Sequence, residues 1–92
     1  MKKVRAHLTI QGIVQGVYFR SDTSGLARRH NCSGWVRNTS NGSVEAVIEG
    51  EEAEVKKVVE WCRSGPPMSR VDRVQALWEE YTGEFDGFSV IS

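Results

Sequence analysis

The sequence lacks an excess of charge of either sign, because its twelve Lys and Arg residues balance twelve Asp and Glu residues. A chain without net charge produces no overall field that would concentrate a polyanion, so nucleic acid is not expected as a partner and any anion site must be local. No apolar run approaches the roughly 18 residues that a membrane-spanning helix needs. The first ten residues, MKKVRAHLTI, begin basic but lack the continuous apolar segment of a signal peptide. These absences predict a cytoplasmic protein without a membrane partner.

Cysteine and histidine are also scarce, with two residues of each. A single pair of cysteines, Cys32 and Cys62, is in a cytoplasmic chain more often two buried thiols than a disulfide, although a bridge stays the alternative. His7 and His30 stand alone, without a second ligand three or four residues away. No metal site and no cofactor are therefore expected.

The length and composition describe one small globular domain. The chain has 92 residues, which suffice for one hydrophobic core and are too few for two. With 39% apolar and 26% charged residues, the composition is that of a soluble globule and not of a disordered chain. We expect residues 1–92 to fold as a single domain and, with this size and charge balance, to be a monomer.

Two kinds of periodicity organise the first half of the chain. Apolar residues alternate with polar ones over residues 4–11, which predicts a strand with one buried face, and they recur at helical spacing over residues 19–30. Asn31 is suited to end that helix in the left-handed conformation. The dipeptide Asn41-Gly42, between two runs of strand-forming residues, predicts an antiparallel hairpin.

The second half adds a helix and two strands. Residues 51–63 carry apolar side chains at helical spacing, with glutamates at the start and an arginine at the end, the order that the helix dipole favours. A strand is expected from Ser69 to Tyr81, and its phase slips between Val71 and Val74, which indicates a bulge. The segment FSVI predicts a short last strand. The order β-α-β-β-α-β with an extra strand predicts an α+β, ferredoxin-like sandwich, in which two helices cover one face of a mainly antiparallel sheet.

The stretch GIVQGVYFR, residues 12 to 20, joins the first strand to the first helix. Backbone N–H groups at a helix N-terminus are unpaired and the helix dipole favours an anion there, so consecutive amides in such a turn can cradle a phosphate. Gly16 would let the backbone approach the ligand, and Arg20 would add a planar, two-pronged cation. A turn followed by a surface arginine explains the same residues, and from them alone the two interpretations are equally favoured.

A second stretch, GWVRN, covers residues 34 to 38. Trp35 is expected to be a core aromatic. Asn38, at the end of a strand with Thr39 beside it, is by itself more often a turn residue. Its amide can also donate to a phosphate oxygen and accept from water, so next to an anion cradle it could orient a nucleophile.

Together the two stretches resemble the signatures of the acylphosphatase family. GIVQGVYFR has the form G-x-V-Q-G-V-x-F-R of that family's phosphate loop, and GWVRN followed by NGSVE is similar to its second signature at the expected distance. The likeness extends to EG before the second helix, to GPP after it, and to SRVDRV and GEFDGFSV further on. It therefore covers nearly the whole chain.

The resemblance implies an enzyme that hydrolyses the carboxyl-phosphate bond of small acyl phosphates, giving a carboxylate and inorganic phosphate, without a metal. It implies that Arg20 binds the phosphate, that Asn38 orients the attacking water, and that Thr39 supplies a supporting hydroxyl. The backbone amides that would complete the cradle belong to Gln15, Gly16, Val17, Tyr18 and Phe19. An acyl phosphate already has a good leaving group, so positioning and charge neutralisation can supply much of the catalysis.

Other interpretations stay open at this point. The same fold could carry an anion or RNA site without catalysis, although RNA binding favours a basic face with exposed aromatics, which this neutral chain does not suggest. The sequence also resembles the module that begins larger hydrogenase maturation factors, but we expect a free-standing protein because no cysteine-rich segment follows. Tyr18 stands where the family often has a smaller residue, and it predicts an altered rim of the pocket.

Overall fold

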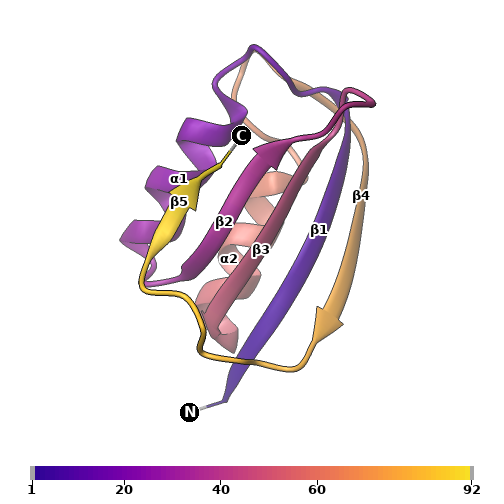
Figure 1. The fold of residues 1–92 in the computed structure, drawn as a ribbon. Helices are drawn as coiled ribbons and strands as arrows, with labels where there is room; N and C mark the ends of the chain where they lie inside the picture. The colour runs from indigo at the N-terminus through magenta and orange to yellow at the C-terminus, as the bar shows by residue number, and fades with distance from the viewer. Residues whose placement is uncertain (1, 92) are drawn as a thin grey trace.

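The computed structural model describes residues 2–91. In chain order its elements are β1 (Lys3–Ile13), α1 (Phe19–Arg29), β2 (Ser33–Asn38), β3 (Val44–Glu51), α2 (Glu52–Cys62), β4 (Arg70–Glu79) and β5 (Phe88–Val90). The two helices lie on one face of the sheet and leave the other face open (Figure 1). The expected α+β, ferredoxin-like sandwich is thereby confirmed. Within residues 2–91, neither helix has the length and apolar character that a membrane crossing requires.

The sheet topology brings the carboxyl ends of three strands to the same end of the molecule. The strands lie in the order β4-β1-β3-β2-β5, and every neighbouring pair is antiparallel except β2 with β5. β1, β2 and β5 consequently run in the same direction. Their carboxyl ends lie together at the upper end of Figure 1, beside the loop that leads into α1 and the hairpin between β2 and β3.

The core fills the space between the sheet and the helices. The alternating residues of β1 are buried as expected, and α2 packs its apolar stripe against them. The buried side chains from these two elements are Val4, Ala6, Leu8, Ile10, Val55, Val58, Val59 and Cys62. From α1, the ring of Phe19 packs on Trp61 of α2 with 5.6 Å between ring centroids. Phe19 thereby anchors the start of α1 to the core.

Both cysteines are buried and free, so the structure confirms the prediction of two thiols. Burial raises the pKa of the Cys62 thiol to about 12. Burial also raises the pKa of the Cys32 thiol to about 11, with a smaller contribution from the negative charge of Glu54. Thiols in these surroundings stay protonated at neutral pH and behave as small core side chains.

Asn31 ends α1 in the left-handed conformation, with a φ of 56°, as the sequence predicts. Its backbone N–H donates to the carbonyl oxygen of Arg28 at 3.1 Å, and the N–H of Cys32 donates to the carbonyl oxygen of Ala27 at 2.9 Å. These two bonds are those of a Schellman motif, which supplies N–H donors to carbonyl groups at the end of a helix.

The predicted bulge is present in β4, which is shorter than expected and runs from Arg70 to Glu79. Gln11 pairs with Arg73 and Gly12 pairs with Val71, so Asp72 is the extra residue. Gly12 has a φ of +136°, and a β-carbon there would collide with the backbone of β4. The first glycine of GIVQGVYFR thus serves the close approach of two strands.

Trp35 is not part of the core, and that prediction is wrong. Its neighbours Gly34 and Val36 are buried, so the period of two places Trp35 on the open face of the sheet. There its ring centroid lies 6.3 Å from that of His7, and the guanidinium of Arg37 lies 5.8 Å from the ring centroid. Trp35 and Val36 are both apolar, so the sequence did not indicate which of them faces the helices.

A buried glutamate on the open face holds the connection from β4 to β5. This segment, residues 80–87, joins the two opposite edges of the sheet and crosses it near the lower end of Figure 1. Glu49 of β3 is fully buried and accepts hydrogen bonds from the backbone N–H groups of Thr82 at 2.9 Å and Gly83 at 3.1 Å. It also accepts from the Thr82 hydroxyl at 3.0 Å and from Arg5 at 3.4 Å. Periodicity alone did not single out this residue.

Replacing Glu49 by glutamine is expected to lower the free energy of unfolding by about 2–4 kcal/mol, because one buried acceptor becomes a donor that faces other donors. Urea denaturation measures the change. Glu84→Gln is the matched control: Glu84 bonds the same Arg5 at 2.8 Å, but its side chain is largely exposed, so the expected loss is much smaller than that of Glu49→Gln. Equal effects of the two substitutions would contradict the anchoring role of Glu49.

Candidate active site

The loop between β1 and α1 leaves a run of backbone amides without partners. None of the N–H groups of residues 15–21 donates a hydrogen bond to any part of the chain that the structure describes. The N-cap residue of α1 is Tyr18, whose side chain makes no capping hydrogen bond. The N-terminus of α1 therefore presents several free donors and the positive end of the helix dipole.

The backbone dihedral angle φ alternates in sign along this loop. Gly16 has a φ of 74° and Tyr18 a φ of 66°, whereas Val17 between them is not in the positive-φ region. Such alternation turns successive N–H groups toward the same side and forms an anion-binding nest. At Gly16 the left-handed conformation is free of strain, and no described heavy atom outside residues 15–17 lies within 4 Å of the position of a β-carbon. A ligand could reach the backbone here.

Arg20 extends from the first turn of α1 and is half-buried. Within residues 2–91 it makes neither a salt bridge nor a side-chain hydrogen bond, while Arg5 and Arg37 are paired with glutamates. A cavity of about 380 Å³ opens beside it, lined by Val14, Gly16, Tyr18, Phe19, Arg20, Ser21 and Val90. The guanidinium is thus available to a negatively charged ligand in that cavity.

The side chain of Gln15 ties the loop to the β2–β3 hairpin. Its amide nitrogen Nε2 donates to the carbonyl oxygen of Thr39 at 2.8 Å and to that of Ser43 at 2.9 Å. Both hydrogens of the amide are used in this way, so the backbone N–H is the donor of Gln15 that is left for a ligand. The contact fixes the loop relative to the strand that carries Asn38.

Asn38 is the last residue of β2. Val36 is buried against the helices, and the alternation places the side chain of Asn38 on the same face, one step nearer to the loop end. Its carbonyl oxygen Oδ1 is buried and has no hydrogen-bond partner among the described residues. A buried acceptor without a partner is costly, so this atom is suited to accept a hydrogen bond from a bound water.

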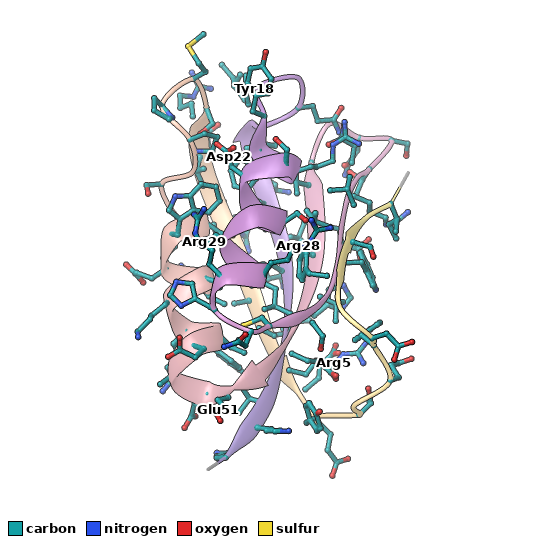
Figure 2. All side chains as sticks on the ribbon, turned by 90° about the vertical axis from the view of Figure 1, so that its left-hand side faces the viewer. Arg5, Tyr18, Asp22, Arg28, Arg29 and Glu51 are labelled. Carbon is teal, nitrogen blue, oxygen red and sulfur yellow. The ribbon has the colours of Figure 1, made fainter. Side chains whose placement is uncertain are left out.

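The remaining predicted site residues differ in which of their groups are accessible to a ligand. The Thr39 hydroxyl is engaged within the hairpin turn, where it bonds Asn41 and Ser43. The side chains of Val17 and Phe19 pack on the core, so only their amides face outward. Tyr18 is 76% exposed, and Figure 2 shows it at the tip of the loop above α1.

Val14 and Val90 line the cavity, and sequence reasoning did not place either in the site. Val90 belongs to β5, whose position beside β2 follows from the complete sheet order. The one available signal is that Phe88 and Val90 are two residues apart and therefore share a face, with Phe88 buried in the core. That face is the one covered by α1.

Known proteins similar to this chain all belong to one family in the matches that follow. The acylphosphatase family model matches residues 6–90. The chain is 49% identical over 90 residues to the acylphosphatase of Pelotomaculum thermopropionicum, with 98% of each chain covered. It is 53% identical over 91 residues to that of Roseiflexus sp., covering 99% of this chain and 98% of the relative. The crystal structure of acylphosphatase from Bacillus subtilis superimposes with a TM-score of 0.92 at 29% identity, covering 97% of this chain and 99% of that chain.

The fold and the matches together define a small hydrolase of the ferredoxin-like α+β class. The chain belongs to the acylphosphatase family. It is an enzyme that acts on small acyl phosphates, as the resemblance of its two signatures implied.

Proposed function

We propose that this chain hydrolyses the carboxyl-phosphate bond of acyl phosphates without a metal, with the phosphate held by the amides of Gln15 to Phe19 and by Arg20. One observation carries the proposal: the unpaired amides of residues 15–21 lie beside a guanidinium that has no carboxylate partner within the described chain. Amide donors and a fixed cation at a helix N-terminus match the charge and the tetrahedral oxygens of a phosphate.

Asn38 is proposed to orient the water that attacks phosphorus. Support comes from its buried Oδ1, which has no hydrogen-bond partner within residues 2–91, and from Gln15, which fixes the loop against the hairpin. As the water oxygen bonds to phosphorus, the bond between phosphorus and the acyl oxygen breaks and the carboxylate leaves with the electron pair. The proton of the water passes to a phosphate oxygen of the substrate. Positioning and charge neutralisation then supply the catalysis.

Thr39 is proposed to act as a supporting residue. Its hydroxyl bonds Asn41 and Ser43, and its carbonyl oxygen accepts from Gln15. Thr39 therefore fixes the hairpin that carries Asn38. In this way Thr39 could affect substrate binding even though its hydroxyl already donates within the hairpin.

We also propose a cytoplasmic monomer that does not bind nucleic acid. On the open face, where RNA would need free cations, Arg5, His7 and Arg37 each lie within ion-pair distance of a glutamate. The guanidinium groups of Arg5 and Arg37, two of the cations of this face, are thus already paired.

The experiment that tests the activity is an assay of phosphate release from benzoyl phosphate and acetyl phosphate by the purified chain. We expect turnover of both substrates and an unchanged rate in excess EDTA, because Arg20 and the amides provide the positive charge at the phosphate. A rate that collapses in EDTA and returns with a divalent cation would contradict metal independence. Binding of inorganic phosphate without turnover would favour the non-catalytic anion-binding alternative.

A further inference from the structure

The cavity beside Arg20 is larger than a phosphate group needs. Its volume of about 380 Å³ lies in the range of small-molecule sites, roughly 300–1,000 Å³. Its lining combines polar groups, which Gly16, Arg20 and Ser21 supply, with apolar surface from Val14, Tyr18 and Val90. This composition would suit a ligand with a phosphate at Arg20 and an apolar group attached to it.

Tyr18 combines an exposed side chain with an unusual backbone conformation. Its ring is 76% exposed, and its backbone adopts the left-handed conformation that residues other than glycine, asparagine and aspartate seldom adopt. Its carbonyl oxygen accepts hydrogen bonds from the N–H of Asp22 and the hydroxyl of Ser21, which fix the residue at the start of α1. Backbone strain of this kind concentrates at ligand sites.

Val90 also lines the cavity and is partly open to solvent, with 45% of its surface exposed. The strand that carries it is firmly fixed, because Nε and Nη2 of Arg28 both donate to the carbonyl oxygen of Phe88, at 3.1 and 3.0 Å. The N–H of Ile91 donates to the carbonyl oxygen of Val36 at 2.9 Å. A rigid apolar wall therefore faces the cavity from the edge strand.

We propose that Tyr18 and Val90 form a subsite for the acyl group and make the enzyme selective for acyl phosphates with an aromatic or other large apolar acyl group over acetyl phosphate. The inference rests on the proposed function, because it assigns the phosphate of the same substrate to Arg20 and the loop. An aromatic acyl group would cover the exposed surfaces of both side chains, whereas an acetyl group is too small to do so.

The test is the ratio of kcat/KM for benzoyl phosphate to kcat/KM for acetyl phosphate, since effects on the common phosphate cradle cancel in this ratio. Tyr18→Asn removes the ring but keeps a residue that tolerates the left-handed conformation. We expect it to lower the ratio about tenfold, and Val90→Thr, which keeps the shape and adds a hydroxyl, to lower it about threefold. Tyr18→Phe retains the ring and should keep the ratio of the parent.

Met68→Ala is the matched control, because Met68 is 74% exposed and apolar but does not line the cavity. The inference is overturned if the parent shows no preference for benzoyl phosphate, or if Tyr18→Asn and Val90→Thr leave the ratio unchanged while both substrates are hydrolysed. Failure of the parent to hydrolyse either substrate overturns the proposed function itself and this subsite with it. A drop in the ratio confined to the two subsite variants supports the assignment.

Discussion

Replacing Arg20 by alanine is expected to lower kcat/KM for benzoyl phosphate by about a thousandfold or more, equivalent to ~4 kcal/mol of transition-state stabilisation. The structure gives two reasons for so large a loss. The guanidinium has no partner within residues 2–91, so it is free to bind the phosphate, and it is half-buried beside the cavity, where solvent screens its charge less. The measurement is steady-state hydrolysis together with binding of inorganic phosphate, which should weaken in parallel.

Two further variants separate charge from geometry. Arg20→Lys keeps the positive charge but loses the planar fork, and we expect an activity between those of the parent and Arg20→Ala. Arg29→Ala removes the same charge from the exposed last turn of α1, and it should retain the activity of the parent. Because Arg20 pairs with no described residue, Arg20→Ala should also unfold at nearly the same urea concentration as the parent. A fully active Arg20→Ala enzyme would overturn the assignment of the phosphate site.

The parts of the fold that were predicted correctly depend on neighbours in the sequence. The alternation in β1, the helical stripe of α2 and the left-handed end of α1 at Asn31 each involve residues within a few positions of one another. The loop from Gly16 to Arg20 is local in the same sense, so a strand-to-helix turn with a glycine and an arginine could be identified before the fold was known. These features follow from periodicity and from the conformational preferences of single residues.

The contacts that could not be predicted from the sequence join residues that are far apart in the chain. The acceptors of the Gln15 side chain lie 24 and 28 residues away. The partners of Glu49 in the β4–β5 connection lie 33 and 34 residues away. Val90 reaches the cavity only because β5 pairs in parallel with β2 at the edge of the sheet. Each of these contacts requires the complete strand order, which local pattern does not specify.

The Trp35 error has a different cause. Trp35 and Val36 are adjacent apolar residues in one strand, so either phase of the alternation would give an apolar face. The choice is made by packing: Val36 lies under the helices, and Trp35 meets the ring of His7 edge to face and lies near the guanidinium of Arg37 on the open face. The same choice of phase decides that Asn38, two residues after Val36, lies on the helix face near the loop. The orientation of the proposed catalytic amide is thus coupled to the burial of Val36.

Replacing Asn38 by alanine is the second change with a large expected effect. We expect kcat to fall by about a hundredfold or more while KM for benzoyl phosphate stays within about threefold, because the amide is proposed to act on the water and not on the ground-state substrate. Its buried Oδ1 has no partner among the described residues, so removing it costs the folded chain no internal hydrogen bond. Urea denaturation of Asn38→Ala should therefore give a midpoint close to that of the parent.

The control for Asn38 must distinguish the amide from the shape of the hairpin. Asn41 lies in the same turn, is exposed, and accepts hydrogen bonds from Thr39 and Ser43. Asn41→Ala therefore perturbs the turn without touching the cavity, and we expect its kcat to stay near that of the parent. Asn38→Asp keeps the size of the side chain but places a carboxylate beside the bound phosphate, so repulsion should raise KM as well as lower kcat. If Asn38→Ala instead raised KM and left kcat unchanged, the amide would belong to phosphate binding, and the water would have to be positioned by the substrate and the loop.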